Sequence, residues 1–184
     1  MVANTNNALL FLITSLLDLA LCAFLLRVLL QLSRSDFYNP ISQLVWRVTQ
    51  PVVGPLSKAI PRWQRLDLAA SLVLLLIALV YVEVVAGLIQ YNPGWLSALW
   101  FALLKIASLA LNLYTLSLFA LALLSWVGPG VSNPAANVLW SLNEPLLRPV
   151  RRILPPIGGL DLSPVPVMLL LQFVDRLLPL GPFR

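Results

Sequence analysis

The sequence has 184 residues, of which 60% are hydrophobic and only 10% are charged, and its formal net charge is +5. Soluble domains carry about 25% charged residues, so this composition excludes a soluble domain and indicates an integral membrane protein. The chain has no histidine and one cysteine, Cys22, which excludes the usual zinc ligand sets, an intramolecular disulfide and catalytic triads with a histidine base. We therefore expect no enzyme activity, no metal and no cofactor.

Four apolar segments follow one another along the chain, and a transmembrane helix needs about 20 such residues. They cover residues 8–32, 68–89, 95–126 and 163–180. The third segment is long for a single span, so we expect it to tilt or to begin with an interfacial turn. The sequence thus predicts an all-α membrane protein with four transmembrane helices.

Lysine and arginine gather in the two long loops, residues 33–67 and 127–162, whereas residues 90–94 and the N-terminal segment have none. Cations concentrate on the cytoplasmic side of membrane proteins, so we expect cytoplasmic loops and external termini. Basic loops beside a membrane favour anionic lipid headgroups over nucleic acid, which we do not expect as a partner. The candidate headgroup ligands are Lys58, Arg148, Arg151 and Arg152.

The two loops coincide when the sequence is shifted by 94 residues without a gap. We therefore predict two parallel span–loop–span repeats, residues 1–94 and 95–184. The matching positions are Asn39 and Asn133, Pro40 and Pro134, Trp46 and Trp140, Pro51 and Pro145, Pro55 and Pro149, and Asp67 and Asp161.

Each loop has the pattern of a short amphipathic helix that lies in the cytoplasmic interface. Asn39 is suited to cap a helix that starts at Pro40, and Pro51 is expected to end it; Pro145 is expected to end the second copy. Asp67 and Asp161 are expected to act as caps before the next spans rather than as functional carboxylates, with Ser163 as a second cap.

Trp46 and Trp140 lie away from the apolar stripe of their helices, by about 140° on a helical wheel. This favours packing of both indoles against protein, and the alternative is an aromatic belt at the headgroup level.

Of the charged residues within the predicted spans, Asp18, Glu83 and Lys105 lie at a similar depth, about 10–15 Å from the outer face. Each costs roughly 2.5–3.5 kcal/mol in a bilayer, so we expect Lys105 to pair with Glu83 or Asp18. The three residues could form a small site for a cation or a proton, or a structural ion pair that fixes helix packing. Arg27 is expected to reach the inner headgroups, and Asp175 and Arg176 point about 100° apart.

The loop motifs also resemble those of a known family. The run from Ser35 to Pro40, followed by Thr49-Gln50-Pro51 and Pro55, resembles the first half of the YggT family of bacterial membrane proteins. Residues 144–152 and 158–164 resemble the second half. The resemblance implies an inner-membrane protein with a duplicated two-span unit. Its bacterial relatives are associated with osmotic-shock tolerance and ion homeostasis, and others with cytochrome assembly, nucleoid distribution or cell division.

Two functions follow as hypotheses. The first is a contribution to osmotic-stress tolerance or ion homeostasis through the charges within the membrane. The second is a scaffold or assembly factor that acts through its two basic cytoplasmic loops. Four spans are few to enclose a pore, so conduction would require a homo-oligomer or a membrane protein partner.

Overall fold

The computed structural model is all-helical, as predicted, and describes residues 2–33, 38–60, 66–127, 134–154 and 161–184. No strand is present in these ranges. The helices are α1 (Val2–Leu32), α2 (Pro40–Ala59), α3 (Leu68–Leu88), α4 (Gly94–Val127), α5 (Pro134–Arg151), α6 (Pro164–Leu177) and the short 3₁₀ helix η1 (Gly181–Phe183).

Three of the described helices are long and apolar enough to cross a membrane. Their apolar parts are Ala8–Leu32 in α1, Leu68–Leu88 in α3 and Gly94–Ser125 in α4, which agree closely with the first three predicted spans. Large apolar side chains also remain exposed on the outer faces of these helices, such as Phe11, Leu19 and Leu116. An apolar surface of this kind suits lipid rather than water.

The fourth predicted span, residues 163–180, is not a continuous helix. Helix α6 has 14 residues and ends at Leu177, and Leu178 has extended backbone with φ −68° and ψ 124°. The next residue is Pro179, which disfavours helical backbone at the residue before it. Fourteen residues extend about 21 Å, which is less than the ~30 Å of a hydrocarbon core.

The loop helices differ from the prediction that Pro51 and Pro145 end them. Helix α2 continues through Pro51 and Pro55, and α5 continues through Pro145 and Pro149. In each helix the two prolines are four residues apart, so they share one face, and that face is exposed. The carbonyls that lose an N–H partner are free to bond water there, and the proline rings displace no buried neighbour.

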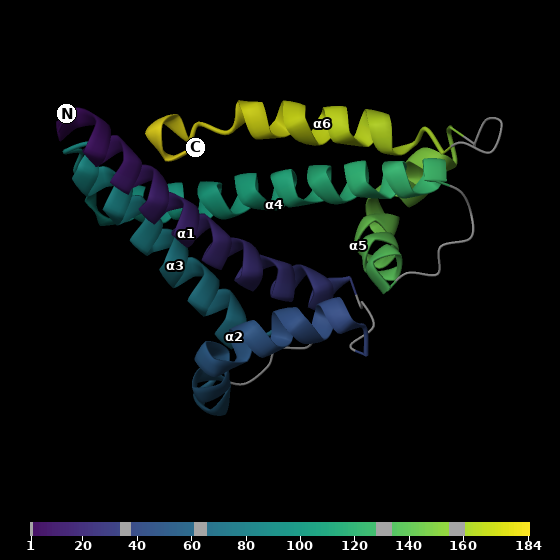
Figure 1. Ribbon diagram of the computed structural model, residues 1–184, viewed down its shortest axis with the longest axis horizontal. Helices are drawn as coiled ribbons and strands as arrows, with labels where there is room; N and C mark the ends of the chain where they lie inside the picture. The colour runs from purple at the N-terminus through teal and green to yellow at the C-terminus, as the bar shows by residue number, and fades with distance from the viewer. Residues whose placement is uncertain (1, 34–37, 61–65, 128–133, 155–160) are drawn as a thin grey trace.

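Helix α1 packs against α3, α4 packs against α6, and α3 joins the two pairs by packing against α4. Figure 1 shows both termini and the α3–α4 connection at one end of the molecule. The two helix pairs diverge from that end, and α2 and α5 lie toward the other. The two loop helices are therefore on the same side of the helix pairs, opposite the termini.

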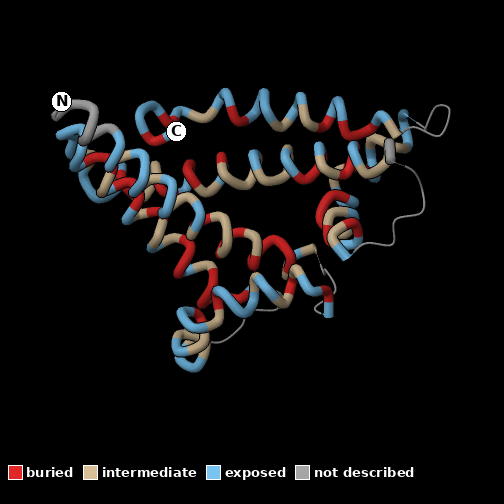
Figure 2. Tube along the Cα trace, viewed as in Figure 1, coloured by how far each residue is buried: buried red, intermediate tan, exposed pale blue. Residues whose placement is uncertain are grey.

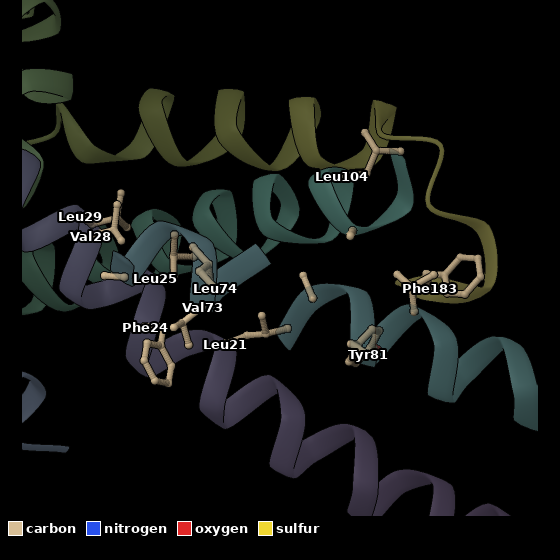
Figure 3. Packing of buried hydrophobic residues seen from close by; sticks show 14 of the residues in the cluster. Leu21, Phe24, Leu25, Val28, Leu29, Val73, Leu74, Tyr81, Leu104 and Phe183 are labelled. Carbon is tan, nitrogen blue, oxygen red and sulfur yellow. The ribbon is translucent and has the colours of Figure 1, made fainter. Parts of the chain in front are cut away.

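Most of the core lies between α1, α3 and α4, and it extends to Leu142 of α5 and to Phe183 of η1. Figure 3 shows the α1 side chains from Leu21 to Leu29 opposite Val73 and Leu74 of α3. A smaller cluster joins α4, α5 and α6 through Leu118, Leu121, Leu147 and Val167. Along each helix the buried positions follow the inward face (Figure 2).

Candidate functional site

An ion pair joins the two halves of the chain. The ammonium of Lys105 in α4 lies 2.9 Å from Oδ1 of Asp18 in α1. The Lys105 side chain is 9% exposed and that of Asp18 is 38% exposed, so the lysine is the buried partner. The same ammonium lies 4.0 Å from the centre of the Tyr81 ring in α3. Lys105 thus links α4 to two other helices, to α1 by an ion pair and to α3 by a cation–π interaction.

Glu83, the other acid that we considered for Lys105, is exposed on α3, and no salt bridge joins it to another described residue. Residues two apart on a helix point about 200° apart, so Tyr81 and Glu83 cannot both face Lys105. The structure places Tyr81 inward at 3% exposure. Tyr81 was not predicted as a contact of Lys105. Its position two residues before Glu83 implies that only one of the two side chains can face Lys105, but the sequence does not say which one.

A second polar cluster lies between α4 and α6. The hydroxyl of Ser108 donates to Oδ1 of Asp175 at 2.5 Å. The guanidinium of Arg184 donates to Oδ2 of Asp175 at 3.1 Å and also to the backbone carbonyl of Asp175. The amide of Asn112 donates to the carbonyl of Ser108 at 2.9 Å. Asp175 therefore has a cationic partner nine residues away, while the adjacent Arg176 is exposed.

Arg27 holds the first loop helix against the spans. Its guanidinium donates to Thr49 at 2.9 Å and to Gln50 at 3.1 Å, both in α2, and to Asp67 at 3.0 Å. Asp67 also caps α3 by accepting from the backbone N–H of Ala70. The side chains of Arg27 and Asp67 are both buried, so the expectation that Arg27 reaches lipid headgroups is wrong. The cause is the buried carboxylate and the α2 side chains beside it, which bind the guanidinium within the protein.

Arg151 holds the second loop helix in a comparable way. It donates to Oδ2 of Asp161 at 2.7 Å and to Glu144 at 2.9 Å, and its guanidinium lies 4.6 Å from the centre of the Trp140 ring. Burial alone would raise the pKa of Asp161, but hydrogen bonds from Ser163 and Arg151 outweigh it and lower that pKa below its ordinary value. Ser163 itself makes no side-chain capping bond to α6, contrary to our expectation, since its hydroxyl bonds Asp161 instead.

The arginine that binds Asp67 and the arginine that binds Asp161 come from different positions of the chain. At the 94-residue offset, Asp67 matches Asp161, but Arg27 matches Leu121 and Arg151 matches Ser57. The first arginine therefore comes from a span and the second from a loop helix. A gapless comparison of the two halves could not find either arginine, because it detects only the positions where both copies have the same residue.

The two loops also contact each other. The side chain of Asn39 accepts from the backbone N–H of Ile41, which caps α2 as predicted, and it donates to the carbonyl of Pro134 at 2.6 Å. The matching Asn133 lies outside the described residues. Trp46 and Trp140 are 40% and 42% exposed, so each indole is partly covered.

Among the candidate headgroup ligands, Lys58, Arg148 and Arg152 are exposed, while Arg151 is bound by Asp161 and Glu144. Within the described ranges no group of three or more possible metal ligands comes together.

Comparison with known proteins places the chain beside a group of uncharacterized bacterial proteins. The model of the CCB3/YggT family matches residues 6–89 and 100–182. The YggT protein of Escherichia coli K12 is 38% identical over 170 residues, which are 92% of this chain and 88% of that protein. An uncharacterized Pseudomonas aeruginosa protein is 39% identical over 94% of this chain and 88% of its own length. An uncharacterized protein from the proC 3' region of Vibrio alginolyticus is 40% identical over 94% of both chains. No solved structure matches the chain.

Proposed function

Because this chain belongs to the CCB3/YggT family, we propose that it is an integral protein of the bacterial inner membrane that contributes to osmotic-stress tolerance or ion homeostasis. Its activity resides in the charged side chains that the helices hold at the depth of the hydrocarbon layer. It acts without enzymatic chemistry and without a resident metal or cofactor.

The observation that carries this proposal is the pair of Lys105 and Asp18. A charged side chain within the hydrocarbon layer costs roughly 2.5–3.5 kcal/mol, and such residues commonly serve transport or proton movement. Lys105 is almost fully buried and its partner comes from the other half of the chain. A movement of α1 away from α4 would therefore separate two opposite charges and leave each without its partner.

In the proposed topology the chain crosses the membrane four times as two parallel repeats, with both termini outside and the loops in the cytoplasm. The family model supports a duplication because it matches one segment in each half, residues 6–89 and 100–182. Helix α6 is the fourth span. Because it is short, either the bilayer is thinner around it or the residues after Pro179 complete the crossing. Lys58, Arg148 and Arg152 bind anionic headgroups on the cytoplasmic side.

The test is growth under hyperosmotic stress in a strain that lacks its own family member. We expect Asp18→Asn and Lys105→Met to lose rescue, because each removes one charge of the pair. Glu83→Gln is the matched control, since it neutralises an acid of α3 that is exposed and outside the pair. Full rescue by both pair variants, at normal protein levels, would show that the charges are structural.

A scaffold role is the second candidate, and the surface of α2 favours it. Leu44 and Val48 are 60% and 61% exposed, although the residues at the matching positions of α5, Val138 and Leu142, are buried. Helix α2 therefore presents an exposed apolar stripe, whereas the matching stripe of α5 is buried within the protein. In the same assay, loss of rescue by Leu44→Ser and Val48→Ser together, with normal rescue by the pair variants, would favour a membrane partner at α2 over transport.

A further inference from the structure

We propose that the α2 stripe of one molecule binds the C-terminal half of α4 in a second copy of this chain, so that copies associate within the membrane. The α2 stripe consists of Leu44 and Val48. The surface of α4, which we call the α4 stripe, consists of Leu116, Phe119 and Leu123, which lie on one face of the helix because they are three and four residues apart. All five side chains are apolar and exposed.

A contact between the two halves of the chain is the template for this interface. Helix α5 of the second half packs against α1 of the first half. Leu142 of α5 belongs to the same core cluster as Leu25 and Leu29 of α1. Val138 lies one helical turn before Leu142 and is also buried. An apolar stripe of α5 is thus covered where the two halves meet.

The two exposed stripes are the counterparts of the residues in this internal contact. At the 94-residue offset, Leu25 matches Phe119 and Leu29 matches Leu123, while the buried stripe of α5 matches the α2 stripe. The counterparts keep side chains of similar size and remain apolar. Among the described residues, however, α4 and α2 do not pack against each other to the extent that α1 and α5 do. The same pair of surfaces therefore occurs twice in the chain and is joined once.

The shape of the molecule explains why the second contact is not made within one chain. Helix α4 diverges from α1 and α3 toward the end that carries α2 and α5 (Figure 1), which leaves the C-terminal half of α4 apart from the first half of the chain. Helices α1 and α4 both run from the end of the termini toward the end of the loop helices. A neighbouring copy with the same orientation in the membrane can therefore present its α4 to α2 in the way that α1 is presented to α5.

The internal contact is also the reason to favour a second copy over lipid. Lipid tails are as apolar as leucine, so helices associate in a membrane only where their surfaces pack closely. The contact of α5 with α1 shows that surfaces of this pattern do pack. Because the α2 stripe and the α4 stripe are different surfaces, each copy would bind one neighbour through α2 and another through α4. Such a heterologous contact produces a ring or an open row of copies.

This inference names the partner of α2 for the scaffold role and rests on the proposed orientation of the chain in the membrane. Its test is cysteine cross-linking of full-length protein in lipid vesicles at a low protein-to-lipid ratio, with the native thiol removed by Cys22→Ser. A protein with both Leu44→Cys and Phe119→Cys, treated with a short bifunctional thiol reagent, should give a ladder of dimers, trimers and larger species. Proteins with one of the two substitutions should stay monomeric alone, and should give dimers but no larger species when mixed.

The matched control combines Leu44→Cys with Val165→Cys, an exposed apolar position at the start of α6, and should stay monomeric. Equal cross-linking of this control would overturn the proposal, because it would indicate random collisions. A double-cysteine protein that stays monomeric would also overturn it and leave lipid as the cover of both stripes. So would cross-linking of a single-cysteine protein with itself, which indicates a symmetric contact, or a cross-link within one chain. Association is measured in vesicles and rescue in growing cells, so this inference can fail while either proposed function holds.

Discussion

Lys105 and Asp18 each carry a charge among apolar helices, so removing one leaves the other without its partner. In a double-mutant cycle with Lys105→Met and Asp18→Asn, measured by unfolding in detergent, we expect a coupling free energy of about 0.5–3 kcal/mol. The value should lie in the lower part of this range, because Asp18 is 38% exposed and is therefore only partly enclosed by protein. The parallel cycle of Lys105→Met with Glu83→Gln is the control and should be additive within about 0.5 kcal/mol. A larger coupling to Glu83 than to Asp18 would contradict the observed pairing.

Asp161 gives a prediction for pH. Its pKa is lowered from the ordinary value of 3.8 in the folded protein by the hydrogen bonds from Ser163 and Arg151. A lowered folded-state pKa means that the carboxylate stabilises the fold at any pH above 3.8, and that this contribution is lost as pH falls through the folded-state pKa. We therefore expect the fluorescence of Trp140, which stacks on Arg151, to change below pH 3.8.

The Asp161→Asn variant should already have the altered Trp140 fluorescence at neutral pH and should lack that acid transition. The measurement uses a protein in which Trp140 is the remaining tryptophan. A transition of equal size in wild type and Asp161→Asn would mean that another group causes it.

At the scale of helices, α2 and α5 are matched in sequence but not in burial. Val48 of α2 is 61% exposed, whereas Leu142 at the same position of α5 is 3% exposed and belongs to the main core. We expect Leu142→Ala to lower the free energy of unfolding by about 2–5 kcal/mol, and Val48→Ala to change it by less than about 0.5 kcal/mol. Chemical unfolding in detergent measures both, and equal losses would contradict the unequal burial of the two helices.

The elements show what could be predicted from the sequence and what could not. Long apolar runs fix α1, α3 and α4, since their length and composition leave no alternative in lipid. The end of α6 at Leu177 was missed even though Pro179 stood in the sequence, because the apolar run continued past it. Pro51 and Pro145 were misjudged for a related reason. A proline removes one N–H donor and its ring crowds the carbonyl four residues earlier, which favours a helix end. The sequence does not say that these prolines lie on an exposed face, where the freed carbonyls can bond water.

The polar contacts were harder to predict than the helices. The cap of Asn39 depends on two neighbouring residues and was predicted correctly. The partner of Arg27, in contrast, depends on a contact between residues 40 positions apart, and that of Asp175 depends on the chain folding back after Pro179. Such partners follow from tertiary packing, and no local pattern encodes them.

At the scale of the whole molecule, the number of spans depends on whether α6 crosses the membrane, because this helix has only 14 residues. We expect reporter fusions after Asp67 and Asp161 to read cytoplasmic, and fusions near Pro93 and after Arg184 to read external, because the loop cations orient the chain. The fusion after Arg184 is the new measurement. A cytoplasmic signal there, with an external signal at Pro93, would reduce the chain to three spans.

The charges also determine which halves can associate. Asp18 occurs in the first half, and the matching residue of the second half is the neutral Asn112; Lys105 occurs in the second half, and its match in the first is Phe11. Two copies of the second half would therefore set Lys105 against the neutral Asn112, and two copies of the first would set Asp18 against Phe11. Only unlike halves place Lys105 opposite Asp18, so we expect this ion pair to favour association of the two different halves. Halves that are made as separate polypeptides should therefore associate in the bilayer through this ion pair, without a covalent link between them.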